Sequence, residues 1–240
     1  DSTMTHIHKT MSTIEEGLGT GWPCWSMSNH DVERVASRWN HGKANPAKSK
    51  VFMAMLLSLR GSVCLYQGEE LGLPEAELTF EQLVDPFGIN FWPEFKGRDG
   101  CRTPFPWNND SKGGFSTSED TWLPMSEAHL PLAVTVQQGD RHSVLHAYRD
   151  FLHFRKHHPA LIDGDIEFLF SDDDVLVFTR THKEESLIVG INSGEQAHFT
   201  APLSYEVRNI VMPEGLKIGE YENHKMILPA NSVYIGKIVS

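Results

Sequence analysis

The chain has 240 residues, of which 40% are hydrophobic and 22% are charged, a composition typical of a folded globular protein. Its 32 acidic side chains outnumber the 21 basic ones, and the resulting net charge of −11 argues against nucleic acid as a partner. The longest apolar run, about Val51–Leu59, is too short to cross a bilayer, so we expect no membrane partner either.

The first 160 residues alternate between predicted helices and predicted strands. Helical spacing of apolar residues, with Asn, Pro and Gly signals at the ends, predicts helices over Ser2–Leu18, Asn45–Gly61 and about Asp140–His157. The apolar stretches GWPCWSMS (21–28) and SVCLYQ (62–67) predict two strands covered on both faces, as in a parallel sheet. Since two strands cannot complete such a sheet, we interpret this α/β segment as the last part of a larger one.

Three cysteines, Cys24, Cys64 and Cys101, are far apart and form no C-x-x-C pair, so neither a disulfide framework nor a zinc site is expected. Cys24 and Cys64 fall within the two apolar strand-like runs, where we expect buried free thiols. A reducing, cytoplasmic location fits this cysteine usage best.

The remainder of the chain divides into a long loop region and a β-rich region. Residues 73–139 are rich in Pro, Gly and aromatic residues and show little periodicity, which is typical of a functional loop. From about Asp163, apolar or alternating stretches separated by turn residues predict antiparallel strands over residues 165–170, 175–182, 186–193, 205–212 and 232–239. We therefore place a domain boundary between residues 160 and 161.

Candidate chemistry begins where the first predicted strand ends, at Asn29, His30 and Asp31. In an α/β barrel the loops that follow the strands converge at their carboxyl edge, so the site is expected there. The Asp31 carboxylate could stabilise developing positive charge, and the His30 imidazole could donate to a bound hydroxyl. The alternative is that Asp31 caps a helix beside a hydrogen-bonded histidine.

A second candidate is the stretch FWPEFKGRDGCRTPFPW, residues 91–107. Arg98 or Arg102 could bind hydroxyls or a carboxylate, and Trp92 or Trp107 could form a platform on which a sugar stacks. The alternative is a loop held together internally by an Arg–Asp ion pair and buried tryptophans. No metal or cofactor is expected, because His142 and His146 have the spacing of a ligand pair but lack a third ligand.

Five motifs carry a family resemblance: SNHDVERVASRW, YQGEELGLPEAEL, DPFG, FWPEFKGRDGCRTPFPW and GGFSTSEDTWLP. Taken in order, they resemble the carboxyl half of α-glucosidases in glycoside hydrolase family 13, the α-amylase family. The resemblance implies that residues 1–160 are the C-terminal portion of a catalytic (β/α)8 TIM barrel, containing strands 7 and 8 and their helices. It also implies that residues 161–240 form the β-sandwich called domain C.

The resemblance implies roles for individual residues as well. Asp31 would be the acidic residue that stabilises the oxocarbenium-like transition state by binding ring hydroxyls. His30 and Arg98 would bind the substrate, with Arg98 on the 4-hydroxyl of the terminal glucose. Glu69 and Glu70 would be structural rather than catalytic, and the two residues expected to support the site are Arg34 and Arg102.

The family's nucleophile and general acid are missing from this chain. Family members use an aspartate on the fourth strand and a glutamate at the end of the fifth, with the carboxyl groups roughly 5 to 5.5 Å apart. Both lie before the Asn-His-Asp segment, so we expect the missing N-terminal part of the barrel to be a partner and this fragment alone to be inactive.

Two functions remain open. The first is a fragment of a retaining α-glucosidase that removes terminal α-linked glucose from short oligosaccharides or disaccharides of the maltose, isomaltose or sucrose type. The second is a non-catalytic amylase-like protein with a binding or structural role. The intact Asn-His-Asp and Gly-Arg-Asp segments favour the first. The sequence leaves open the linkage preference and the choice between hydrolysis and glucosyl transfer.

Overall fold

The computed structural model describes residues 3–40, 42, 44–118 and 120–239. Ser2, where the first helix was predicted to begin, and Glu119 of the last motif lie outside these residues. The chain forms two compact units. The β unit comprises Asp1–Trp25, Lys50–Cys64 and Ala147–Ser240, and the site unit comprises Ser26–Ser49 and Leu65–His146.

The helices are short, apart from three of 13 to 15 residues. The α-helices are α1 (Met4–Leu18), α2 (Val35–Arg38), α3 (Pro46–Ser58), α4 (Pro86–Phe91), α5 (Val134–Gln138), α6 (Val144–Lys156) and α7 (Pro159–Asp163). The 3₁₀ helices are η1 (Glu69–Leu71), η2 (Phe80–Gln82), η3 (Asp99–Cys101) and η4 (Glu127–Leu132).

The three long helices confirm the sequence-based predictions, with differences at their ends. The Thr3 hydroxyl caps α1 by accepting from the His6 backbone N–H at 3.2 Å. Asn45 caps α3 in the same way, since its Oδ1 accepts from the Ala47 N–H at 3.0 Å. The third helix, α6, begins at Val144 rather than near Asp140.

Strands β1 (Cys24–Trp25) and β2 (Ser62–Val63) pair in parallel, as predicted. The prediction that they are buried on both faces is wrong. Because side chains alternate between the faces of a strand, Cys24, Ser62 and Cys64 share one face, and all three are exposed. Only the opposite face, with Trp25 and Val63, is half-buried, so the two cysteines are not the buried thiols that we expected.

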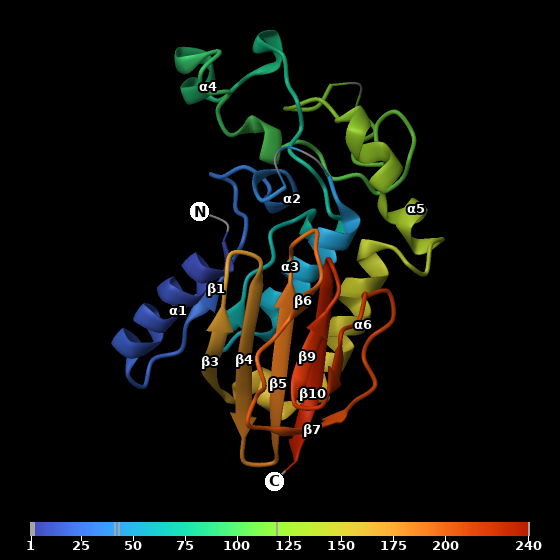
Figure 1. Ribbon diagram of the computed structural model, residues 1–240. Coiled ribbons are helices and arrows are strands. Elements are labelled where there is room, and N and C mark those ends of the chain that lie inside the picture. Colours follow the sequence, from blue (N-terminus) through green and yellow to red (C-terminus); the bar gives the residue numbers. More distant parts are fainter. Residues whose placement is uncertain (1–2, 41, 43, 119, 240) are drawn as a thin grey trace. The chain divides into compact units, whose positions relative to one another are not determined.

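The C-terminal part of the β unit contains two antiparallel sheets (Figure 1). The five-stranded sheet has the order β3 (Asp165–Ser171), β4 (Val175–His182), β5 (Glu185–Asn192), β10 (Ser232–Val239) and β7 (Glu206–Asn209). The three-stranded sheet has the order β6 (His198–Phe199), β9 (Lys225–Leu228) and β8 (Glu220–Glu222). An antiparallel β-region was predicted here, although β6, β8 and β9 were missed.

The five-stranded sheet is covered on both faces. On one face, Val177 and Ile188 pack with Met226 and Leu228 of β9. Gly190 of β5 permits this approach, because a Cβ there would lie 2.0 Å from the Met226 sulfur. Helices α1 and α7 contact β3, β4 and β5, and Figure 1 shows α1 lying beside β3 and β4. The interior strand β4, which lies between β3 and β5, is consequently buried over six successive residues.

The site unit consists mainly of turns and short helices, as the long predicted loop region indicated. Two small apolar clusters organise it, one around Leu71, Leu73 and Leu145 and the other around Leu78, Leu83 and Leu123. Its compactness thus comes from side-chain packing and hydrogen bonds rather than from a sheet. The two predicted domains, residues 1–160 and 161–240, do not coincide with these two units, each of which combines separate segments of the chain. The boundary between residues 160 and 161 stays a prediction.

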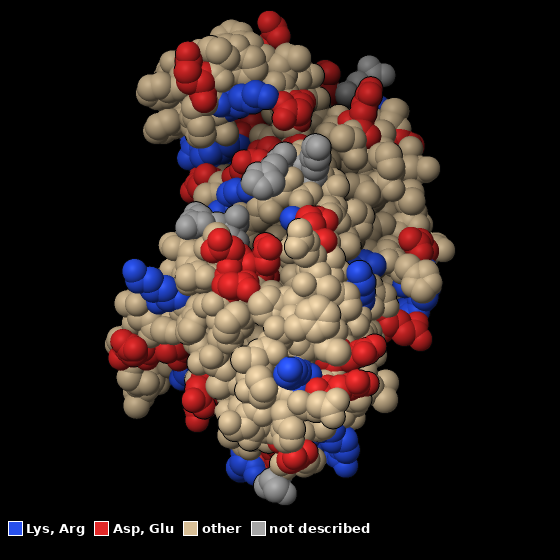
Figure 2. Space-filling model, in the orientation of Figure 1, with Lys and Arg blue, Asp and Glu red and all other residues tan. Residues whose placement is uncertain are grey.

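On the face drawn in Figure 2, acidic and basic side chains are intermixed. Among the described residues, no helix combines the length and the apolar character needed to span a membrane.

Candidate active site

The turn around Asp31 is shaped by its neighbouring asparagine. The Asn29 side-chain oxygen accepts from the Asp31 backbone N–H at 2.8 Å, which is an Asx turn. The Ser28 hydroxyl accepts from the Val35 N–H at 3.0 Å, where α2 begins. The N-cap residue of α2 is Arg34, so Asp31 is not a helix cap, and that alternative interpretation is wrong.

The Asp31 carboxylate lies between two guanidinium groups and an imidazole. Its Oδ1 accepts from Arg98 Nη1 and from Arg102 Nη2, each at 3.0 Å. Its Oδ2 lies 3.4 Å from His30 Nε2, and 50% of the Asp31 side chain is exposed. The structure thus brings together the three predicted site residues, His30, Asp31 and Arg98, on an accessible surface with donors and acceptors suited to hydroxyl groups.

Arg102 and Arg34 support this surface in different ways. Arg102 Nε donates to the His30 carbonyl at 2.7 Å, so it fixes the backbone as well as the Asp31 carboxylate. Arg34 is buried and donates to the carbonyls of Gln67 and Cys101 at 2.6 and 2.9 Å. Burial lowers the pKa of Arg34, and its role is to join segments that are distant in the sequence.

Arg98 is held by Asp85. Arg98 Nε and Nη2 donate to the two Asp85 oxygens, each at 2.9 Å, and the Arg98 backbone N–H donates at 2.8 Å. These hydrogen bonds hold the pKa of the Asp85 carboxyl well below its ordinary value, and they raise the pKa of Arg98. The internal Arg–Asp pair that was considered as an alternative role for Arg98 therefore exists alongside its contact with Asp31.

The glutamates of the Gly-Glu-Glu segment differ from a catalytic pair. Glu69 is buried, and burial raises its pKa to about 7. Glu70 accepts from the Gly68 N–H at 2.7 Å and lines a cavity beside Gln67. Glu75, which the sequence analysis did not single out, accepts from the Arg34 N–H at 2.8 Å, and burial raises its pKa to about 7. Glu70 and Glu75 thus hydrogen-bond backbone groups of the same unit, and the structural role expected for Glu69 and Glu70 stays a prediction.

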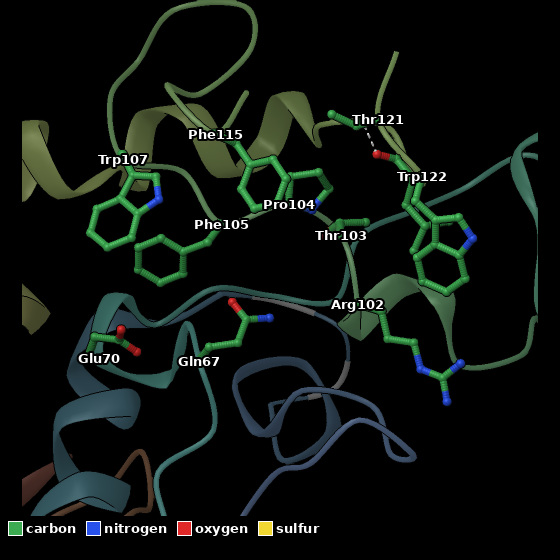
Figure 3. Close-up of a pocket in the computed structure, with 11 residues that line it drawn as sticks. Gln67, Glu70, Arg102, Thr103, Pro104, Phe105, Trp107, Phe115, Thr121 and Trp122 are labelled. Carbon is green, nitrogen blue, oxygen red and sulfur yellow. Dashed lines mark hydrogen bonds between the residues drawn. The ribbon is translucent and has the colours of Figure 1, made fainter. Parts of the chain in front are cut away.

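An aromatic cavity of about 430 Å³ is lined in part by Arg102 (Figure 3). Figure 3 shows Phe105, Trp107 and Phe115 along one wall, opposite Gln67 and Glu70, with Trp122 near Arg102. Trp107 is exposed and lines this cavity, whereas Trp92 packs against the cluster of Leu78, Leu83 and Leu123. Of the two tryptophans proposed as sugar platforms, only Trp107 is therefore placed on an open surface.

Among the described residues, no group of three or more His, Cys, Asp and Glu side chains is arranged to hold a metal ion.

The important residue that the sequence analysis missed is Asp85. The Asp-Pro pair of the DPFG motif is a helix-start signal, and the Asp85 side chain indeed caps α4 by accepting from the Phe87 N–H at 3.2 Å. Its pairing with a residue 13 positions away has no local signature.

The chain is similar to known proteins over most of its length. A family model described as alpha amylase, catalytic domain, matches residues 1–164. The chain is 47% identical to a probable alpha-glucosidase of Rhizobium meliloti (strain 1021) over 98% of its own length and 42% of that protein. It is 29% identical to an oligo-1,6-glucosidase of Parageobacillus thermoglucosidasius over 80% of its length and 38% of that protein.

A solved structure gives the same result. The alpha-glucosyl transfer enzyme XgtA superimposes with a TM-score of 0.95 and 44% sequence identity, over 100% of this chain and 44% of that one. The chain thus spans less than half the length of these relatives. It contains part of a TIM-barrel fold, and antiparallel β-sheets follow this part in the C-terminal region. The chain belongs to the α-amylase catalytic-domain family.

Proposed function

We propose that this chain is the C-terminal part of a retaining α-glucosidase that releases terminal α-linked glucose from short oligosaccharides or disaccharides. The observation that carries this proposal is the accessible Asp31 carboxylate, bound by Arg98 and Arg102 beside the His30 imidazole. Relatives named alpha-glucosidase and oligo-1,6-glucosidase support the substrate class. Maltose, isomaltose and sucrose are the candidate disaccharide types.

In the proposed mechanism, Asp31 binds hydroxyls of the glucose ring more tightly as the ring flattens and gains positive charge in the transition state. The His30 imidazole, which is largely exposed, hydrogen-bonds a neighbouring hydroxyl. Arg98 contributes to binding the 4-hydroxyl of the terminal glucose. Arg102 keeps Asp31 in place through its contacts with the carboxylate and with the His30 carbonyl.

We further propose that β1 and β2 are strands 7 and 8 of the barrel and that residues 161–240 are domain C. The partner of this chain is then the upstream part of the same barrel, which carries the nucleophile and the general acid, and the chain alone does not hydrolyse glucosides. The length of the relatives supports this arrangement. The exposed face of β1 and β2, with Cys24 and Cys64, and the open aromatic cavity support it as well. A cytoplasmic location fits the unpaired cysteines.

A second candidate function is glucosyl transfer. It shares the covalent glucosyl–enzyme intermediate but passes the sugar to an acceptor other than water. The observation that favours it is the 44% identity to a protein described as an alpha-glucosyl transfer enzyme. Analysis of the products formed with and without an added acceptor alcohol separates the two activities. A non-catalytic role is the remaining alternative.

The decisive experiment is Asp31→Asn in the complete polypeptide, which includes the upstream part of the barrel. We expect kcat for an aryl α-glucoside to fall by roughly 100-fold or more, because a hydrogen-bond partner of the transition state is lost. Asp120→Asn, at an exposed aspartate of the same unit, is the control and should leave kcat unchanged. Near-normal turnover by the Asp31→Asn enzyme would show that Asp31 lacks the proposed role.

A further inference from the structure

The Asp85 carboxylate is buried, and most of its hydrogen-bonding capacity is used by one residue. None of its side-chain surface is exposed, whereas 31% of the Arg98 side chain is. The Arg98 Nε, Nη2 and backbone N–H all donate to it. A bidentate pair between a carboxylate and a guanidinium fixes the plane of the guanidinium as well as its position. The Nη1 that remains is the atom that contacts Asp31, at 3.0 Å.

Asp85 is itself held rigidly. Its backbone N–H and that of Val84 donate to the buried Asp99 Oδ2 at 2.8 and 2.7 Å. Its own Oδ1 accepts from the Phe87 N–H at the start of α4. The position of the Asp85 carboxylate is therefore fixed by the hydrogen bonds of its backbone to Asp99 and by its own hydrogen bond to the start of α4.

Two glycines bring the Arg98 turn close enough for this contact. Gly97 has a φ of +80°, and a Cβ there would lie 2.8 Å from the Gly88 Cα. A Cβ on Gly88 would lie 2.6 Å from the Lys96 carbonyl oxygen. The backbones of α4 and of the turn before Arg98 thus touch without intervening side chains. The Phe87 ring, 5.3 Å from Arg98 Cζ, limits movement of the guanidinium further.

We propose that Asp85 is a positioning residue for substrate binding: it directs the Arg98 guanidinium so that only Nη1 faces Asp31 and the sugar. Asp85 touches no substrate itself and acts through Arg98. This inference rests on the proposed function, because it explains what positions Arg98, a residue to which the proposed function gives a role in substrate binding. Its consequence is that removing Asp85 weakens glucoside binding through a misplaced Arg98.

The test is a double-mutant cycle in the complete polypeptide with an aryl α-glucoside as substrate. Asp85→Asn keeps the size of the side chain but replaces one acceptor oxygen by an amide that cannot accept from a guanidinium. We expect kcat/KM to fall by about 10- to 100-fold, mainly through KM, with Arg98→Ala causing at least the same loss. Because Asp85 acts through Arg98, the double variant should be no worse than Arg98→Ala alone.

The control is Glu77→Gln, which removes an exposed ion pair with Lys96 on the same loop and should leave kcat/KM unchanged. Additive losses in the double variant would show that Asp85 acts through the fold and would overturn the inference. If Asp85→Asn gives no folded protein, Asp85→Glu keeps the charge but displaces it, and the same non-additivity is expected.

The cycle also separates this inference from the function on which it rests. If Arg98→Ala leaves the kinetics unchanged, the proposed substrate-binding role of Arg98 is wrong and the positioning role is wrong with it. If Arg98→Ala is strongly impaired but both Asp85 variants bind and turn over the glucoside normally, only the positioning role is wrong.

Discussion

At the scale of single residues, the surroundings of an acidic side chain distinguish its role. Asp31 and Glu69 both follow strands of the parallel pair, so their positions in the sequence alone do not distinguish their roles. Asp31 is half-exposed and receives hydrogen bonds from two guanidinium groups. Glu69 is buried, and its pKa is raised to about 7 mainly because burial disfavours the charged form. Of these two carboxyl groups, that of Asp31 is the accessible one.

The raised pKa of Glu69 makes the stability of the chain depend on pH. The pKa of this carboxyl is about 7 in the folded chain, against an ordinary value of 4.5, so the folded state binds more protons between these two pH values. The contribution of Glu69 to the free energy of unfolding therefore falls as pH rises through this window. The loss amounts to at most about 3 kcal/mol when the group is fully ionised.

Glu69→Gln should remove this contribution. We expect the free energy of unfolding of the variant to fall less than that of the wild type between about pH 5 and about pH 8, as measured by urea denaturation. Burial lowers the pKa of His129 to about 4, which gives the opposite slope, but His129 is common to both proteins and cancels in the comparison. Glu127→Gln, at an exposed position, is the control; equal slopes for all three proteins would contradict the prediction.

The sequence identified the three central site residues but not the residue that holds one of them. His30, Asp31 and Arg98 stand in short motifs with a recognisable order, and the structure brings them together. Asp85 is linked to Arg98 through a tertiary contact that depends on the touching backbones at Gly88 and Gly97. Such a contact leaves no periodicity or local spacing in the sequence, so it became apparent only in three dimensions.

At the scale of elements, the long helices and strands were predicted from the sequence, whereas several short strands were not. Helices α1 and α6 have an apolar face, and α3 is a continuous apolar segment that follows the Asn45 cap; both patterns can be recognised over several turns. Strands β6, β8 and β9 have two to four residues, too few for an alternating pattern to be recognised. The burial of β1 and β2 was predicted wrongly, because apolar composition alone does not show whether other strands cover a sheet.

Arg180 is a further element-scale feature that the pattern did not indicate. It lies in β4 and is fully buried. Within the described part of the chain, its guanidinium donates to the backbone carbonyls of Ser58, Leu161, Gly164 and Asp165, at distances of 2.6 to 3.3 Å. Ser58 ends α3 and Leu161 lies in α7, so one side chain satisfies carbonyl groups near two helix ends that would otherwise lack partners.

Arg180→Met should therefore destabilise the chain strongly. The methionine fills much of the space but leaves several buried carbonyls without a donor, so we expect the free energy of unfolding to fall by about 3 kcal/mol or more. Arg208→Met makes the same change at an exposed position of β7 and should have an effect within about 0.5 kcal/mol of zero. Urea denaturation of the two variants beside the wild type measures the difference. Equal stabilities for both variants would contradict the role given to Arg180.

At the scale of the whole molecule, the order of the motifs along the chain carries the family identity. A single Asn-His-Asp triplet is common, but five motifs in one order match the α-amylase family, whose model covers residues 1–164. Two large aromatic side chains of the site unit are exposed in this chain. Trp107 and Trp122 expose 54% and 68% of their surface, and both line the aromatic cavity, so two large apolar side chains lie open in one place.

If the upstream part of the barrel covers this cavity, the complete polypeptide should protect both tryptophans. Hydroxyl-radical oxidation with mass-spectrometric mapping compares Trp107 and Trp122 in this chain and in the complete polypeptide, without any glucoside present. We expect their oxidation to be several-fold slower in the complete polypeptide, while Phe199, an exposed aromatic residue of the β unit, changes little. Equal oxidation of the two tryptophans in both proteins would show that the cavity stays open. Protection that appears only when a glucoside is added would assign the cavity to the sugar instead of to the missing part of the barrel.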